Sequence, residues 1–393
     1  MMRNIVFLKA EIVSMAPLFI GDDDGNVLID DETNMAYLPA TSIAGSFKAY
    51  LKSIDEDYKM LFGTQDEKNS IMSSVYVKDA FAKINEFDRR DGVRIDNESG
   101  SNVGGCKIER LYLGQGLKFD LGFEIHGEED NIEDLKNMIY KCLNALDEGI
   151  IRLGGHKSNG LGIFKIISAK EIKFNLNDKE DLFKYLKKDH SGMVDVKETI
   201  DNVPVDDRYV KFVMKGEFTT PLLIKAPKTF NPKDVDDRSI KSGDEYLIPG
   251  SSFKGVLRSR VEKIAKYFGS VDEASEIFGS INGKDKENIL SRVFVRESII
   301  DNRKFEEKVY YNRIKIDKFT GGVRHSGLVN DMPVQGKTQF DVIYRKKNDE
   351  KFDDYAIGIL ALALRDLGTE NLTLGGGNNI GRGRFKASTM TIS

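Results

Sequence analysis

Two glycine-rich segments carry residue types that can bind a phosphate backbone. Residues 374–386 read LGGGNNIGRGRFK, and residues 153–165 read LGGHKSNGLGIFK. Because glycine lets a backbone take φ > 0 and approach another chain closely, peptide N–H groups in such loops can point at an anion. A solvated turn is the alternative for the arginines of the later loop. The candidate ligands in the two loops are His156, Lys157, Asn378, Arg382 and Arg384.

A proline followed by hydroxyl residues stands before an apolar stretch at two places, beginning at Pro39 and at Pro249. Hydroxyl groups can cap a helix by accepting a bond from its first free N–H groups. The candidate caps are Thr41, Ser42, Ser251 and Ser252. A helix start is also a candidate phosphate site. The ligands expected there are Ser42, Lys48, Ser251, Ser252, Lys254 and Arg258.

Two short segments of the chain are rich in aspartate. Residues 22–24 are three aspartates before Gly25, and a second acidic loop contains Asp234, Asp236 and Asp237. A carboxylate can hold a hydrated Mg²⁺ beside a phosphate. Taken alone, an ordinary acidic turn is the simpler interpretation of residues 22–24.

The chain repeats itself. Residues 374–386 and 153–165 differ by 221 in number and share four glycines in register. Further matches follow the same order in both halves, with smaller offsets upstream, as expected when surface loops differ in length. They join residues 316–321 to 95–100, 291–297 to 73–79, and 249–255 to 39–45. This order indicates duplication of one large unit.

The length of 393 residues and the repeat predict two modules, residues 1–174 and 209–393, joined by a polar linker at 175–208. We expect one short helix at 180–187. With only Cys106 and Cys142, a disulfide framework is excluded, and a reducing cytoplasm is the simple expectation. No apolar run is long enough to span a membrane. The net charge of −4 argues against nonspecific DNA coating but allows a local basic groove.

Each module reads strand, helix, strands, helix, strand. Residues 131–146 place apolar side chains at spacings of three and four, which predicts a helix packed on a sheet with Cys142 in its core face. The predicted fold class is α+β, with two tandem ferredoxin-like βαββαβ modules. The strands are expected at 5–13, 75–77, 117–125, 161–167 and 209–218, and the other helices at 46–54, 252–265 and 355–367.

Residues 246–259, residues 314–321 and the terminal glycine-rich loop resemble the repeat-associated mysterious protein (RAMP) superfamily of CRISPR systems. The likeness is to backbone subunits of type III effector complexes, and the fused pair resembles the tandem subunits of subtype III-D. The resemblance implies an RNA-recognition-like (RRM-like) core, a groove along the guide RNA, and thumb hairpins at about 97–113 and 319–334. The implied partners are guide RNA, complementary target RNA and other subunits.

The resemblance also implies metal-dependent cleavage of target RNA by an aspartate in the loop before the Pro-Gly-Ser-Ser helix. Asp24 matches that position, and Asp236 is the first choice in the second copy, with Asp237 next. Asp24 and Asp236 would be the ligands of Mg²⁺ or Mn²⁺ while a 2′-hydroxyl attacks in line.

Three alternatives remain open. A guide-processing endonuclease would use a histidine as general base, and only His126, His156, His190 and His325 are present. Of these, His325 falls in the second thumb, where RNA contact is the more natural role. A noncatalytic scaffold would only space guide and target. A stand-alone RNA-binding protein is disfavoured by the slightly acidic composition.

Overall fold

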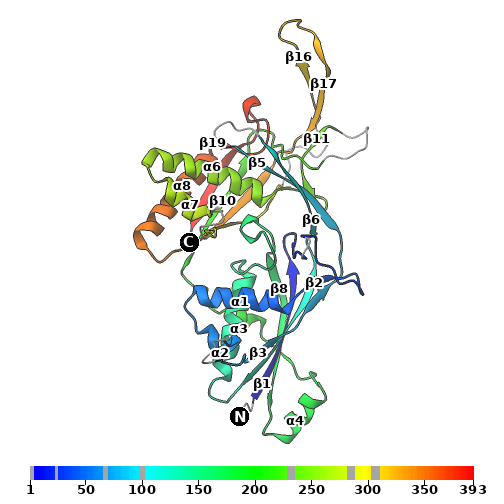
Figure 1. The fold of residues 1–393 in the computed structure, drawn as a ribbon, viewed down its shortest axis with the longest axis vertical. Helices are drawn as coiled ribbons and strands as arrows, with labels where there is room; N and C mark the ends of the chain where they lie inside the picture. Colours follow the sequence, from blue (N-terminus) through cyan, green and yellow to red (C-terminus); the bar gives the residue numbers. More distant parts are fainter. Residues whose placement is uncertain are drawn as a thin grey trace. The chain divides into compact units, whose positions relative to one another are not determined.

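A computed structural model describes residues 4–22, 25–64, 70–96, 102–227, 235–280, 288–301 and 310–393. The chain divides into two compact units (Figure 1). The first comprises residues 1–88, 112–157 and 161–207. The second comprises residues 89–111, 158–160 and 208–393, so it takes in two pieces of the first sequence repeat. In the described residues, no helix is both long and apolar enough to cross a membrane.

The first unit is built on a five-stranded antiparallel sheet in the order β3-β7-β1-β8-β9. Ranked in chain order, its four main strands lie 2-3-1-4, the arrangement of a ferredoxin-like sheet. Apolar faces of the helices cover the sheet, and Cys142 is fully buried as expected. The bounds are β1 Asn4–Ser14, β3 Val75–Val77, β7 Lys118–Gly127, β8 Phe164–Asn175, β9 Val194–Asp195, α1 Ala40–Ser53, α2 Tyr58–Phe62 and α3 Ile132–Asp147.

The second unit repeats this sheet as β14-β18-β10-β20-β19. An irregularity of the sheet also recurs. The register between β1 and β8 shifts after Glu11, and the register between β10 and β20 shifts after Lys215. Both modules are therefore ferredoxin-like, which confirms the predicted fold class. The bounds are β10 Tyr209–Phe218, β14 Val293–Val295, β18 Lys337–Arg345, β19 Thr369–Thr373, β20 Arg384–Ile392, α6 Gly250–Phe268, α7 Val271–Phe278 and α8 Glu350–Gly368.

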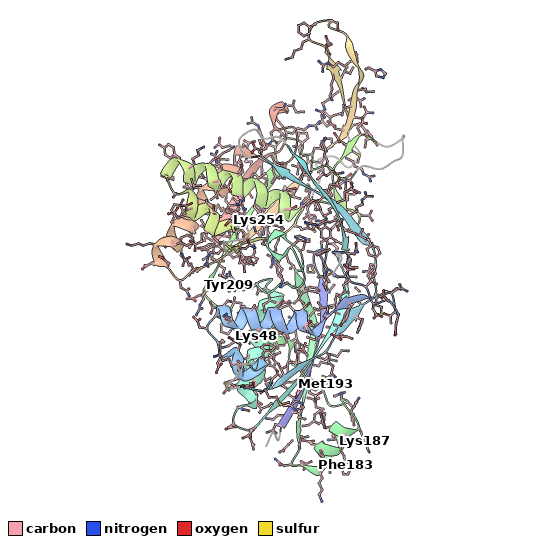
Figure 2. The ribbon with its side chains drawn as sticks, viewed as in Figure 1. Lys48, Phe183, Lys187, Met193, Tyr209 and Lys254 are labelled. Carbon is pink, nitrogen blue, oxygen red and sulfur yellow. The ribbon has the colours of Figure 1, made fainter. Side chains whose placement is uncertain are left out.

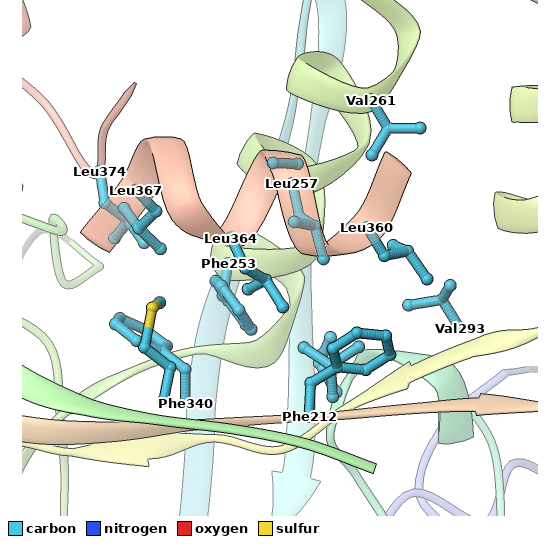
Figure 3. Close-up of a cluster of buried hydrophobic side chains, with 14 of the residues drawn as sticks. Phe212, Phe253, Leu257, Val261, Val293, Phe340, Leu360, Leu364, Leu367 and Leu374 are labelled. Atoms are coloured by element: carbon cyan, nitrogen blue, oxygen red, sulfur yellow. The ribbon is translucent and has the colours of Figure 1, made fainter. Parts of the chain in front are cut away.

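The core of the second unit lies between its sheet and helices α6 and α8 (Figure 3). The ring of Phe340 from β18 stacks on Phe253 of α6 with centroids 4.5 Å apart, and it meets Phe385 of β20 edge-on at 5.0 Å. These rings fix the start of α6 and the strand after the glycine-rich loop against one another, so the core positions two of the predicted motifs.

A long hairpin interrupts each module. The first pairs β5 (Phe87–Ile95) with β6 (Asn102–Leu113), and the second pairs β16 (Tyr311–Ile316) with β17 (Val323–Met332). The hairpins expected at 97–113 and 319–334 exist, but those bounds missed the outgoing strands. The second hairpin extends away from its sheet (Figure 1).

Residues 175–207 of the predicted linker belong to the first unit, and Arg208 belongs to the second. They form α4 (Lys179–Leu186), β9 and α5 (Lys197–Asp201). Ile200 is fully buried, and Asn144 of α3 donates a 2.5 Å side-chain hydrogen bond to the carbonyl of Val203. The remaining short elements are β2 Ala36–Leu38, β4 Ala80–Ala82, β11 Asp237–Arg238, β12 Lys241–Ser242, β13 Glu245–Ile248, β15 Ser298–Ile299, η1 Lys157–Asn159 and η2 Asn378–Ile380.

Candidate nucleic-acid interface and acidic loop

The two glycine-rich loops are held by the same backbone hydrogen bonds. Gly162 N–H donates to the carbonyl of Pro17 at 3.1 Å, and Gly383 N–H donates to that of Pro221 at 3.0 Å. A second pair also recurs, since Gly155 N–H donates to Phe19 and Gly376 N–H donates to Leu223. Each loop is thus built against the segment that follows the first strand of its module, which is strong evidence for duplication.

Two glycines are required by this geometry. Gly162 has φ +67° and Gly383 has φ +75°, and a Cβ at either would lie 1.9 Å from the carbonyl oxygen of Leu153 or Leu374. No side chain fits so close to a backbone oxygen. The signal read from the sequence, glycines in register, therefore reflects a backbone that only glycine can build.

The polar side chains of the later loop meet different environments. Asn378 and Arg384 are exposed. Arg382 is buried: its Nη1 lies 2.9 Å from Asp331 Oδ2, and its guanidinium lies over the ring of Tyr311, 5.4 Å from the centroid. Arg384 is therefore placed to meet a phosphate from solvent, whereas Arg382 is occupied by an internal carboxylate.

In the earlier loop, residues 153–165, the cation Lys157 contacts helix α1. Lys157 Nζ lies 3.0 Å from the hydroxyl oxygen of Ser46 on α1. Burial lowers the pKa of Lys157, because desolvation penalises its charged form. His156 has φ +54° and its ring lies 5.4 Å from that of Phe19. Lys157 thus joins the loop to α1.

The predicted hydroxyl caps are wrong, because both helices begin earlier than expected. Pro39 is the N-cap of α1 and Pro249 that of α6, and neither cap makes a side-chain hydrogen bond. Thr41, Ser42, Ser251 and Ser252 lie inside the first turns. Instead, the Asp79 carboxylate accepts a hydrogen bond from Ala40 N–H at 2.7 Å. This cap comes from 39 residues away, so sequence spacing gave no signal for it.

Lys48 of α1 and Lys254 of α6, both labelled in Figure 2, have partners within the chain, as does Arg258. Lys48 lies over the ring of Tyr58 at 5.3 Å, and Arg258 donates to Glu262 at 2.7 Å. Lys254 is only 8% exposed and donates to the Ser291 hydroxyl at 2.8 Å. Of the six ligands predicted at these helix starts, Ser251 is the exposed one, and Thr41, predicted as a cap, is exposed too.

The hairpin of the second unit presents exposed rings. His325 is exposed on β17, and Phe319 at the turn is 99% exposed. Exposed aromatic faces can stack on nucleobases of any sequence. The described part of the hairpin therefore offers stacking groups.

The two acidic loops lie partly outside the described residues. Asp24 and Asp234 lie outside the described residues. Asp236 is exposed, and its Oδ2 accepts a hydrogen bond from Asn330 N–H at 2.9 Å. Asp237 is 8% exposed and lies 2.7 Å from Lys225 Nζ. Among the three predicted catalytic carboxylates, Asp236 is therefore the described one that solvent reaches.

A preformed cage for a metal ion is not found among the described residues, since none of their His, Cys, Asp and Glu side chains form a group of three. Mg²⁺ commonly keeps several waters and takes one or two carboxylates together with substrate phosphates. The exposed Asp236 carboxylate, with Oδ2 fixed by a backbone N–H, fits that mode of binding.

Comparison with known proteins decides the family. A family model described as the RAMP superfamily matches residues 11–165 and 215–386. The chain belongs to the RAMP superfamily. RAMP proteins are CRISPR-associated and bind RNA, and the two matched regions confirm that this chain carries two RAMP modules in tandem. No curated protein matches the chain.

Sequence reasoning missed several residues around the RAMP loops. Asp331 and Tyr311 contact Arg382, and Arg313 contacts the same Asp331. Single residues at the base of a hairpin give no periodic signal. The repeat itself offered one clue, since Arg382 has a leucine, Leu161, at the matching position of the first copy.

Proposed function

We propose that this RAMP protein is a backbone subunit of a type III CRISPR ribonucleoprotein, with a fused arrangement like that of subtype III-D. In this role it holds the guide RNA and cleaves complementary target RNA. The observation that carries the proposal is the repetition, in both ferredoxin-like modules, of one glycine-rich loop held by the same backbone bonds. Base pairing with the guide supplies sequence specificity, since contacts of this kind read backbone shape and charge.

Asp236 is the proposed metal-binding carboxylate of the second module, and Asp24 is its counterpart in the first. Mg²⁺ or Mn²⁺ bound there would stabilise negative charge on the scissile phosphate. The Asn330 N–H fixes one oxygen of Asp236, and the residue is exposed to solvent. The chain's own task is then to hold the target so that the neighbouring 2′-hydroxyl can attack in line.

Replacement of each aspartate in the assembled complex tests the proposal. Asp24→Ala and Asp236→Ala should each abolish one cut in a complementary target, because loss of one electrostatic stabiliser costs about 10²- to 10³-fold in rate. Target binding should be retained. Asp31→Ala and Asp244→Ala are matched controls, since both remove an exposed aspartate outside the two acidic clusters.

Removal of the metal ion is a second test of the proposed function. Chelation of the parent complex should stop every cut, and Mg²⁺ or Mn²⁺ should restore them. If both aspartate variants cut at every parental position, the chain is a scaffold that only spaces guide and target. Cutting that persists after complete chelation would contradict the metal-dependent mechanism.

A further inference from the structure

A buried charge cluster lies at the base of the second hairpin. The side chain of Asp331, at the end of β17, is fully buried. Its Oδ2 lies 2.5 Å from Arg313 Nη2 on β16 and 2.9 Å from Arg382 Nη1 in the glycine-rich loop. These contacts have ion-pair distances without the alignment of hydrogen bonds, and Oδ1 has no hydrogen-bond partner among the described residues. A carboxylate withdrawn from water in this way is stable only while its cations stay in place.

The strand that carries Asp331 also holds the acidic loop. β11 pairs in parallel with β17, and Asp237 lies opposite Asp331. Asn330, the residue before Asp331, donates its N–H to Asp236 at 2.9 Å. On the other side, Ser239 N–H donates to the carbonyl of Met332 at 3.1 Å. Movement of the end of β17 would therefore move Asp236.

We propose that Asp331 is a positioning residue for the Asp236 carboxylate. Arg382 links Asp331 to the glycine-rich loop and Arg313 links it to β16, while the backbone of β17 links it to the acidic loop. The inference rests on the proposed function, in which Asp236 serves cleavage. It adds that the site is completed by an ion-pair cluster that touches neither RNA nor metal, and that Arg382 acts through Asp331.

The first module does not contain this cluster. At the offset of 221, Arg110, Gly92 and Leu161 stand where the second copy has Asp331, Arg313 and Arg382. The carboxylate and both of its cations are therefore lost together. Disruption of the cluster must then affect one cut only, and the cut of the first module is an internal control.

The test uses the full chain in its ribonucleoprotein with saturating complementary target. Asp331→Asn should slow the Asp236-dependent cut by roughly 10- to 100-fold, the scale expected when a reacting group is misplaced by about 1 Å. The Mg²⁺ concentration for half-maximal rate should rise at that cut and stay unchanged at the other. Arg382→Lys, which keeps the cation, should remain closer to the parent than Arg382→Gln. Arg110→Gln is the matched control in the first copy.

Amide hydrogen exchange on the full chain provides a readout that does not depend on cleavage. Asp331→Asn should reduce protection in the peptide covering residues 235–240 while β1 keeps its protection. If Asp236→Ala leaves all cuts intact, the proposed function fails but this measurement still decides whether Asp331 holds the loop. Arg382→Gln serves in the same way if Asp331→Asn does not fold. Unchanged exchange with unchanged cutting, or equal slowing of both cuts, would overturn the inference.

Discussion

Arg382 and Arg384 are two residues apart and meet opposite environments. The guanidinium of Arg382 is 7% exposed and faces the buried Asp331, whereas Arg384 extends into solvent at the start of β20. In an extended strand, residues two positions apart point to the same face. Strand alternation therefore does not explain why the two arginines differ. The difference arises because Arg382 lies at a loop turn, between Gly381 (φ +84°) and Gly383 (φ +75°). We therefore assign the solvent-facing phosphate contact to Arg384.

Replacement of Arg384 by Gln should weaken RNA binding about equally for all sequences. It should also lower the slope of log affinity against log salt by roughly 0.7 to 1, as expected for one lost phosphate contact. Lys351→Gln, at the far end of α8, is the control, since it removes an exposed cation away from the loop. Affinity measured by filter binding across a salt series checks this. An unchanged slope would show that Arg384 makes no phosphate contact.

For single residues, the sequence identified the cations of the repeated motifs but did not predict which of them are buried. Lys254 and Arg382 were expected to contact RNA because they are basic and lie in repeated motifs. Their burial depends on Ser291 and Asp331, which are distant in sequence and give no pattern of their own. The identity of a cation is visible in a sequence, whereas its internal partner is decided by the fold.

The glycine-rich loop is the element on which the proposed function depends most. The two ends of the loop are joined by a backbone hydrogen bond, in which the N–H of Leu374 donates to the carbonyl of Gly383 at 3.0 Å. The matching bond in the first copy joins Leu153 to Gly162, also at 3.0 Å. The loop is therefore closed by its own backbone before any RNA is bound.

Gly383→Ala should open this closure. The left-handed φ of +75° costs a residue with a side chain about 1 to 3 kcal/mol, and the added Cβ would also lie 1.9 Å from the Leu374 carbonyl oxygen. We expect a lower melting temperature and weaker RNA binding. Gly162→Ala should behave alike.

Gly255→Ala is the control for these glycine variants. It lies in α6, and nothing lies within 4 Å of the position its Cβ would take. Alanine is favoured over glycine inside a helix by about 0.5 to 1 kcal/mol, so this variant should keep or raise the melting temperature. Thermal unfolding of the three variants compares them. A Gly383→Ala protein as stable as the parent would contradict the required glycine geometry.

Element order was predictable because apolar periodicity and the repeat report it directly. The boundaries of the helices and strands were harder to predict from the sequence. Helix α1 starts at Ala40, six residues before the expected 46, and α6 starts at Gly250, two residues before the expected 252. Both start early because Pro39 and Pro249 act as N-caps, and proline is suited to the extended backbone just before a helix. The outgoing hairpin strand β16 was missed because all six of its residues are exposed, which removes the apolar alternation that marks a half-buried strand.

At the scale of the whole molecule, the duplication is nearly symmetrical in architecture and unequal in chemistry. Both modules keep the 2-3-1-4 sheet, the register shift and the glycine-rich loop. Only the second has Arg382 and Arg384, with Leu161 and Ile163 at the matching places of the first. We infer that both modules use the shared architecture to bind RNA and that they differ in their affinity for it.

Ultraviolet crosslinking of the full chain to its copurified RNA, with the crosslinked peptides identified by mass spectrometry, tests the central claim most directly. The claim is that one RNA-holding module was copied and that each copy places its glycine-rich loop on the RNA backbone. We predict crosslinks in peptides from residues 153–165 and 374–386, fewer in the first because it has Ile163 in place of the solvent-facing Arg384. RNA crosslinked efficiently elsewhere, with both loops unmodified, would contradict the account.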